Sequence, residues 1–354
     1  MYRILALNPG STSTKIALFE NEKCVLQHSI EHSQNELAKF TSVMAQEDFR
    51  RSALLKTLEE HTISLESLSA LVVRGGLLKP LAGGIYQVNE KMAADLKNCT
   101  YGQHASNLGA VIALPLSRNY EIPLLTVDPV TVDEFEDTAR FSGLKGINRL
   151  SMSHALNMKA VSRKTAKKLG QSYGDINLVV AHLGSGISVS AHRKGRMIDV
   201  NNANNEGPFS LERCGTLPAI SLINLCFNGG HSEREMIALV TGKGGIFSYL
   251  GTKDFRLVEK LIGKGDEEAH RVVDAMAYQV SKEIGAMAAV LKGLVDRIVL
   301  TGGMAHSSLV TEPISQRVSF IAPVVIFPGE EEMNSLAEGA LRSLRGEEKI
   351  RTYA

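Results

Sequence analysis

The sequence has few cysteines and no long apolar run, and each scarcity excludes a class of protein. Its four cysteines, Cys24, Cys99, Cys214 and Cys226, form no CxxC pair and no cluster with histidine, so we expect neither a zinc site nor a disulfide framework. No apolar segment reaches the ~20 residues that a membrane-spanning helix needs. The N-terminus also lacks the pattern of a targeting peptide. These absences predict a cytoplasmic protein with no membrane partner.

The sequence also has no excess of positively or negatively charged residues. The chain has 39 lysines and arginines against 38 aspartates and glutamates, a formal net charge of +1. This balance gives no strong field that would favour nucleic acid, so we expect small-molecule ligands. The length of 354 residues is long for one hydrophobic core and favours two domains.

Two common nucleotide-binding motifs are absent. The segment "TGKGG" at 241–245 has a glycine after the lysine, and Ile237 stands where the first glycine of a P-loop belongs. The segment "GSGISV" at 184–189 lacks the third glycine of a dinucleotide fingerprint. A nucleotide would therefore need another kind of phosphate-binding turn.

Such a turn is present in "LALNPGSTSTKIALFE" at 5–20. Gly10 lets backbone amides approach a phosphate, while the hydroxyl residues and Lys15 supply donors and charge. Solvation of an ordinary Pro-Gly turn is the alternative interpretation.

The pattern of apolar residues around this turn predicts the order β-β-β-α-β-α-β. Three strands at 3–8, 14–20 and 24–30 form an antiparallel meander by their turn chemistry. Helices are predicted at 35–60, 90–97 and 107–119, the last with Pro115 inside it, and strands at 70–76 and 123–128.

From residue 176 the pattern begins again with strand, glycine-rich turn, strand, polar turn and strand. His182 to Ser185 stand at the turn that corresponds to Asn8 to Ser11, and each turn is followed by period-2 alternation. A long helix at 266–292, a strand "RIVLTGG", a strand "APVVIF" and a final amphipathic helix follow. We therefore predict an α/β fold with two copies of one domain facing each other across a cleft, residues 1–150 with 335–354 and residues 151–334. Nucleotide binding between two such turns suits phosphoryl transfer.

Eight segments in order resemble the acetate kinase and butyrate kinase family, within the superfamily of actin, Hsp70 and hexokinase. They are "LNPGSTSTKIALF", "VVRGGLLKPLAGGIYQVNEKM", "YGQHASNLGA", "TVDPVTVDEFEDTARFSG", "SMSHALNMKA", "HLGSGISVSAHRKGRMIDVNNANNEGPFSLERCGTLP", "VLTGGMAHS" and "FPGEEEMNSLAEGALR". The resemblance implies two duplicated ribonuclease H-like (actin-like ATPase) domains flanking a nucleotide cleft, the first on the acyl-substrate side and the second on the nucleotide side. It also implies at least a homodimer.

The resemblance further implies a reaction: the γ-phosphoryl group of ATP moves reversibly to a short-chain carboxylate, giving an acyl phosphate and ADP, with Mg²⁺. Because the acceptor is already ionised near neutral pH, the enzyme needs cations and donors instead of a strong general base.

The resemblance assigns roles to particular residues. The first phosphate turn would consist of Asn8, Ser11, Ser13 and Lys15, and the second of His182, Gly184, Ser185 and Gly186. His154 would donate to the moving phosphoryl group, and the guanidinium of Arg213 suits a carboxylate or phosphoryl group. His104 is a further catalytic candidate. Asp128 and Glu331 would hold Mg²⁺ directly or through water, while Gly302 and Gly303 would let adenosine lie against the backbone.

One position departs from the acetate kinase pattern. Leu71 stands where those enzymes carry an arginine, and Arg74 follows three residues later. We assign the acceptor's cation to Arg74, and "RGGLLKP" resembles the butyrate-type pattern. Isobutyrate, acetate and propionate remain alternative substrates. A sugar kinase with Asp128 as general base and a non-catalytic ATP-binding scaffold are the other hypotheses.

Most of these residues also have a purely structural interpretation. The histidines can be ordinary hydrogen-bonded core residues, and Asp128 can be a turn aspartate. Glu331 stands where a carboxylate favours a helix start, and Gly302 and Gly303 can simply form a tight turn.

Overall fold

The computed structural model describes residues 1–354, which form two compact units. The first unit contains Met1–Val132 and Glu331–Ala354, and the second contains Asp133–Glu330. The boundaries expected from the sequence lay at 150/151 and 334/335. Residues 133–150 pack with the second unit because the Glu136 N–H donates to the Ile198 carbonyl and Arg149 pairs with Asp199.

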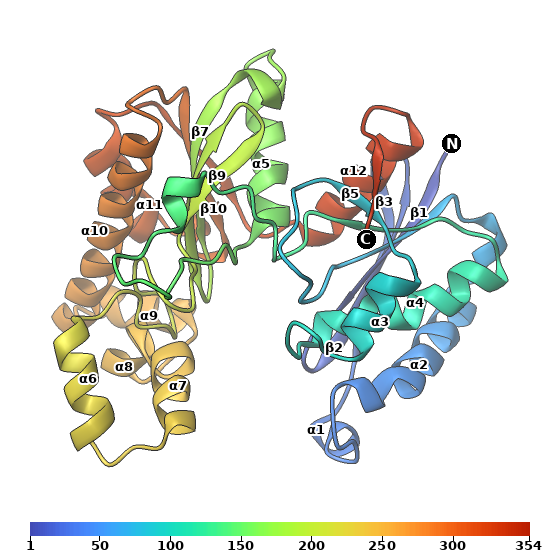
Figure 1. The fold of residues 1–354 in the computed structure, drawn as a ribbon, viewed down its shortest axis with the longest axis horizontal. Coiled ribbons are helices and arrows are strands. Elements are labelled where there is room, and N and C mark those ends of the chain that lie inside the picture. The colour runs from blue at the N-terminus through green and yellow to red at the C-terminus, as the bar shows by residue number, and fades with distance from the viewer. The chain divides into compact units, whose positions relative to one another are not determined.

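The first unit is built on a seven-stranded sheet (Figure 1). Strands β1 to β3 form the predicted antiparallel meander, and β1, β4 and β6 run parallel. Two strands of three residues each, β5 and β12, were not predicted, because three residues are too few to show a period. The sheet order is β12-β5-β6-β4-β1-β2-β3, with β1 (Arg3–Pro9), β2 (Ser13–Glu20), β3 (Lys23–Glu31), β4 (Ala70–Val73), β5 (Ile85–Gln87), β6 (Leu124–Val127) and β12 (Ile350–Thr352).

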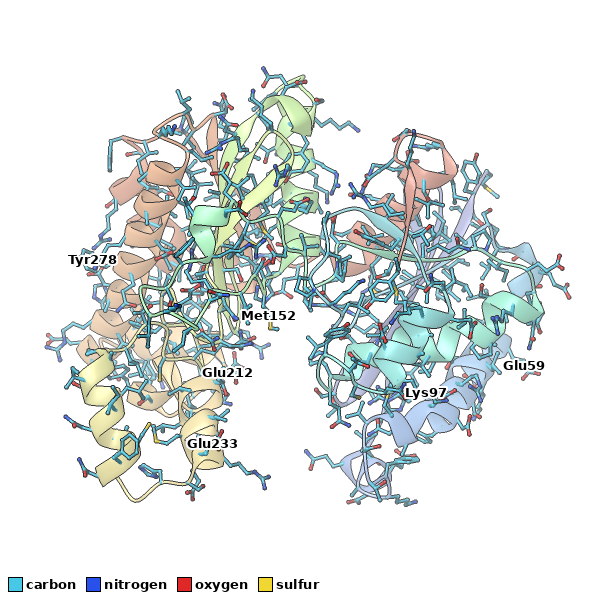
Figure 2. All side chains as sticks on the ribbon, viewed as in Figure 1. Glu59, Lys97, Met152, Glu212, Glu233 and Tyr278 are labelled. Carbon is cyan, nitrogen blue, oxygen red and sulfur yellow. The ribbon has the colours of Figure 1, made fainter.

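Helices α2, α3 and α4 pack together beside this sheet (Figure 1). Lys97, labelled in Figure 2 at the end of α3, pairs with Glu47 of α2 at 2.8 Å. The predicted helix at 35–60 is wrong in part: the helix breaks after Leu37, and Ser42 Oγ accepts from the Ala45 N–H in a local turn. The helices are α1 (Gln34–Leu37), η1 (Met44–Gln46), α2 (Glu47–Glu60), η2 (Leu65–Ser67), α3 (Glu90–Lys97), η3 (Ala105–Asn107), α4 (Leu108–Asn119) and α12 (Glu332–Leu344).

The second unit repeats the arrangement of the first. Its sheet order, β11-β10-β7-β8-β9, matches β6-β4-β1-β2-β3 strand for strand, with the same parallel and antiparallel pairs. Even the bulges correspond, at Leu18/Phe19 and at Ala191/His192. This confirms the predicted duplication. The strands are β7 (Asn177–Leu183), β8 (Ile187–Arg193), β9 (Arg196–Val200), β10 (Arg297–Gly302) and β11 (Val324–Pro328).

The long predicted helix of this unit is α10, and its apolar stripe lies in the core. Asp266 caps α10 by accepting from the Ala269 N–H at 3.0 Å, while Val273, Met276 and Val280 are buried. No helix in the chain is both long and apolar enough to cross a membrane. The helices are η4 (Asp137–Arg140), α5 (Ala155–Lys168), η5 (Tyr173–Asp175), α6 (Ala219–Asn228), α7 (Glu233–Gly242), α8 (Gly245–Leu250), α9 (Phe255–Gly263), α10 (Glu267–Val290), η6 (Gly303–His306) and α11 (Ser308–Val318).

Buried neutral histidines make the fold sensitive to acid. His192 is fully buried, with Nδ1 at 2.6 Å from the Tyr173 hydroxyl and Nε2 at 2.7 Å from Ser190 Oγ. Burial holds the pKa of His192 well below its usual value, and burial also lowers the pKa of His32 and His104. The unfolded chain therefore binds more protons below pH ~6.5, and stability is lost as the pH falls through that value.

We expect the free energy of unfolding to decrease between pH 7.5 and 5.5, by up to about 1.4 kcal/mol per pH unit for each such histidine. Urea unfolding at several pH values measures this slope. His192→Gln should make the slope shallower, whereas the same change at exposed His231 should leave it unaltered. An unchanged slope in the His192 variant would show that this histidine does not couple folding to protons.

Candidate functional site

A cavity of about 230 Å³ in the first unit gathers five of the predicted site residues. It opens where β1 and β4 end, as ligand sites in α/β sheets commonly do. Three of its lining side chains are cations or ring donors, so the cavity suits an anion. The lining residues are Asn8, Pro9, Gly10, Ser13, Lys15, Arg74, His104, Ser106 and Glu332.

Arg74 enters this cavity directly after β4, while Leu71 lies in the core with 3% of its surface exposed. The Arg74 guanidinium pairs with the carboxylate of Glu332, and Asn8 Nδ2 donates to the same carboxylate at 2.6 Å. Glu332 was not among the site residues predicted from the sequence. Its only signal was membership of the run of three glutamates that begins at Glu330.

His104 is held as a neutral donor. Its Nδ1 accepts from the Ser106 N–H at 3.2 Å and lies 2.7 Å from Ser106 Oγ, so we assign the ring proton to Nε2. Burial, and then the charge of Arg74, lower the pKa of His104. The ring is therefore an uncharged N–H donor at neutral pH.

Three predicted residues of this unit do not line the cavity. Asp128 follows β6 with 1% exposure and a φ of +39°, and its Oδ1 accepts from the Gly84 N–H at 2.7 Å. Glu331 is exposed at the start of α12, and Ser11 is exposed at the tip of the β1–β2 turn.

In the second unit, the turn between β7 and β8 lies under Arg213. A Cβ on Gly186 would lie only 2.3 Å from Arg213 Nη1, so glycine is required for this approach. Ser210 Oγ donates to the Ser185 carbonyl at 2.5 Å and accepts from the Arg213 N–H at 3.3 Å, which joins the turn to the segment that carries Arg213. Glu212, the preceding residue, is labelled in Figure 2.

The guanidinium of Arg213 makes no hydrogen bond or ion pair within the protein, and its Nε is buried without an acceptor. Burial lowers the pKa of Arg213, partly offset by the charge of Glu212. A partly buried cation without a partner destabilises the fold, and an anionic ligand would supply the acceptor that Arg213 lacks.

His154 and His182 stack beside the same turn, with ring centroids 3.8 Å apart and planes 9° apart. His182 is nearly fully buried, with Nδ1 at 2.9 Å from Asn157 Oδ1 and Nε2 at 2.9 Å from Glu330 Oε1. His154 Nδ1 lies 3.0 Å from Ser188 Oγ. Because the stack and the Glu330 contact fix both rings, His154 presents a positioned imidazole. Glu330 was likewise not among the site residues predicted from the sequence.

The two predicted glycines after β10 differ in surroundings. Gly302 has φ +94° and ψ 173°, and a Cβ there would lie 2.5 Å from the Leu183 carbonyl oxygen. A Cβ on Gly303 would meet no atom within 4 Å. Gly302 therefore serves close packing of β10 on β7, whereas Gly303 faces open space.

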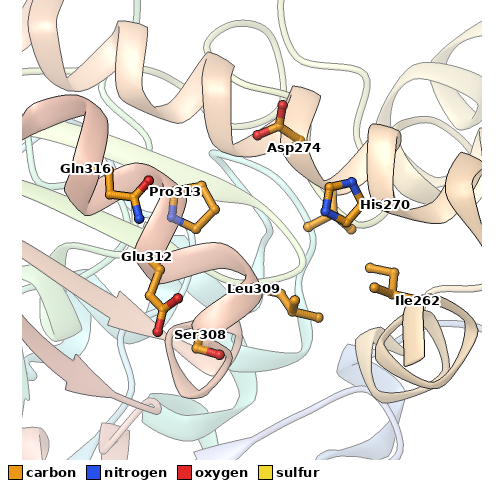
Figure 3. A pocket seen from close by; sticks show the side chains of 9 residues that line it. Ile262, His270, Asp274, Ser308, Leu309, Glu312, Pro313 and Gln316 are labelled. Atoms are coloured by element: carbon orange, nitrogen blue, oxygen red, sulfur yellow. The ribbon is translucent and has the colours of Figure 1, made fainter. Parts of the chain in front are cut away.

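A separate cavity of about 160 Å³ contains none of the predicted residues (Figure 3). It lies between α10 and α11, where Asp274 pairs with Arg317 at 2.8 Å. His270 and Glu312 also line it.

The duplicated sheets and their paired glycine turns are those of an actin-like fold. The chain belongs to the acetokinase family, whose sequence model matches residues 140–337. Members of this family are carboxylate kinases that use ATP or ADP with a divalent metal ion. The resemblance seen in the sequence is thus confirmed at the level of the acetokinase family.

Solved structures agree on the fold. An acetate kinase from Porphyromonas gingivalis is 21% identical with a TM-score of 0.79, over 97% of this chain and 100% of that one. A propionate kinase from Francisella tularensis subsp. tularensis SCHU S4 is 20% identical with a TM-score of 0.73, over 96% and 99%. A ROK family protein from Streptococcus pneumoniae TIGR4 matches at 11% identity and a TM-score of 0.52, over 98% and 99%.

Proposed function

We propose that the protein phosphorylates a short-chain fatty acid with ATP, with butyrate as the preferred acceptor, and that the reaction is reversible. The observation that carries the proposal is the unpartnered, partly buried guanidinium of Arg213 above a glycine turn. Membership of the acetokinase family supports the reaction class.

In this proposal the first unit binds the acceptor and one phosphate. Arg74 attracts the acyl carboxylate, and the neutral His104 donates Nε2–H to it. Lys15 and the hydroxyls of Ser11 and Ser13 bind a phosphoryl oxygen. The carboxylate attacks phosphorus in line, and no proton has to be removed from it first.

The second unit holds the nucleotide in the same proposal. The turn Gly184–Ser185–Gly186, oriented by His182, contacts the phosphates, and adenosine lies against Gly302 and Gly303. Arg213 and His154 donate to the phosphoryl group in transfer, where negative charge must be stabilised.

A magnesium ion fits the carboxylate in the first unit. Mg²⁺ is commonly held by one or two carboxylates together with substrate phosphates, and it neutralises phosphate charge. Asp128 and Glu331 were the ligands expected from the sequence. We propose Glu332 as the direct or water-mediated ligand, because it is the carboxylate that lines the cavity beside Asn8.

Paired variants test this ligand. Glu332→Gln is expected to raise the Mg²⁺ concentration for half-maximal activity about 10-fold, because one charged oxygen ligand is lost. Magnesium titrations of Glu332→Gln and Glu331→Gln give the comparison, and we expect a smaller change in the second. The reverse order would identify Glu331 as the metal ligand.

Acyl specificity is tested by trapping the acyl phosphate with hydroxylamine. We expect hydroxamate with ATP and butyrate, a lower kcat/KM with acetate and propionate, and none with hexoses. Differences of one methylene are worth only ~1 to 3 kcal/mol, so linear and branched acids of two to five carbons must all be compared. If kcat/KM were highest with acetate or isobutyrate, that acid would replace butyrate as the proposed acceptor. Phosphorylation of hexoses alone would refute the proposal.

A homo-oligomer, at least a dimer, is part of the proposal. Helix α6 supports it, because none of its residues is buried although most are apolar, with Ile220 72% and Phe227 84% exposed. A second copy of the chain would cover such a surface.

A further inference from the structure

The β1–β2 turn is held from behind by a buried arginine that the reaction scheme does not use. Arg50 lies on α2 with 1% of its surface exposed. Its Nη1 donates to the carbonyls of Gly10 at 2.9 Å and Ser13 at 3.0 Å, and its Nη2 donates to the Ser11 carbonyl at 3.0 Å. One side chain therefore fixes three carbonyls of a single turn.

The remaining contacts complete this anchor. Arg50 Nε donates to Gln46 Oε1 at 2.9 Å, and Nη1 also reaches Thr14 Oγ1 at 3.2 Å. The Thr12 carbonyl accepts from the His32 N–H at 2.8 Å. All four carbonyls from residue 10 to residue 13 thus face donors on the α2 and β3 side.

Because peptide groups are planar, this arrangement of carbonyls also fixes the direction of the N–H groups that could bind an anion. In a trans peptide the N–H points opposite to the preceding C=O, so the N–H groups of Ser11 and Thr12 point away from Arg50. Both residues are exposed, and neither N–H has a hydrogen-bond partner in the protein. Successive free N–H groups of this kind form a concave site for phosphate oxygens.

The charge of Arg50 fits the same role. All its hydrogen-bond partners are neutral, and it forms no ion pair. Burial accordingly lowers its pKa. A buried cation without a counter-charge destabilises a fold, and an anion on the other side of the turn would compensate it.

We propose that Arg50 is a positioning residue for phosphate binding: it orients the amides of Ser11 and Thr12 toward a phosphoryl group and supplies positive potential from behind the turn. The inference rests on the proposed function for the identity of the ligand, ATP. It requires only that the turn binds phosphate.

The test compares Arg50→Met and Arg50→Lys with Arg51→Met, a matched control on the same helix that pairs only with Glu47 and Asp48 at the surface. Thermal shifts are measured with ATP, tripolyphosphate and adenosine, together with kcat and KM. We expect the Arg50 variants to lose at least half of the shift caused by ATP and tripolyphosphate and to raise KM for ATP about 10-fold, the equivalent of one charge-assisted contact. Their shift with adenosine should stay as in the wild type.

Arg50→Lys keeps the positive charge but cannot donate to three carbonyls at once. Compared with Arg50→Met, it should therefore regain more of the wild-type stability than of the wild-type phosphate binding. If Arg50→Met fails to fold, the thermal shifts of Arg50→Lys test the inference by themselves. Equal loss of the adenosine and tripolyphosphate shifts, or no loss of either, would overturn the inference. A wild type that binds tripolyphosphate but makes no acyl phosphate would refute the proposed function and leave the role of Arg50 standing.

Discussion

Arg213→Ala is expected to lower kcat by about 10³-fold, with a smaller change in KM for ATP. The reason is that the proposed role of this guanidinium is to stabilise charge on the phosphoryl group in transfer, where single donors contribute about 10²- to 10³-fold in rate and arginines up to about 10⁵-fold. Steady-state kinetics of acyl phosphate formation measure both constants. Arg213→Lys should recover only part of the rate, because an ammonium lacks the planar pair of donors.

The control is Arg234→Ala, which removes an exposed arginine of α7 in the same unit. Its kinetics should match those of the wild type. If Arg213→Ala formed acyl phosphate at the normal rate, Arg213 would have no part in catalysis. If neither the wild type nor the variant formed acyl phosphate, the non-catalytic ATP-binding hypothesis would gain support.

Gly302→Ala is expected to lower the free energy of unfolding by about 3 kcal/mol. Its φ and ψ fall in a region that essentially only glycine occupies, at a cost of ~1 to 3 kcal/mol for other residues. The added methyl group would also collide with the Leu183 backbone, and overpacking adds ~1 to 3 kcal/mol. Urea unfolding followed by circular dichroism provides the measurement.

Gly303→Ala is the matched comparison, because its new methyl group meets no atom of the protein. It should unfold as the wild type does but raise KM for ATP if adenosine lies against this residue. Equal loss of stability in the two variants would mean that the close approach of β10 to β7 does not restrict residue 302.

The duplicated arrangement of strands and helices was predictable because each element has its own local sequence pattern. Period-2 alternation after the turns at Gly10 and Gly184 predicted β2 and β8, and both exist with the expected neighbours. Asp266 and the apolar stripe from Val273 onward likewise predicted α10 to within two residues at each end. Such signals lie within one element and do not depend on the rest of the chain.

The contacts between distant segments were not predictable in this way. Glu332 meets Asn8 across 324 positions in sequence, and nothing local separates it from Glu331. Arg50 has no local sequence signal that distinguishes it from the other charged residues of its helix. Its role depends on carbonyls of a turn that lies about 40 residues earlier in the chain. The helix break after Leu37 was missed because the hydroxyl of Ser42 competes with helical hydrogen bonding.

The corresponding turns of the two units are secured by unlike chemistry: a buried guanidinium in the first and the Ser210 hydroxyl in the second. The sheets repeat each other down to their bulges, so the two turns hold equivalent places in one repeated framework and differ in the side chain that fixes them. Ser210 in the second unit also contacts the backbone of Arg213. A substitution of Ser210 is therefore expected to displace both the β7–β8 turn and Arg213. In the first unit, by contrast, Arg50 on α2 holds the turn, so substitutions around that turn do not involve the contact between Ser210 and Arg213.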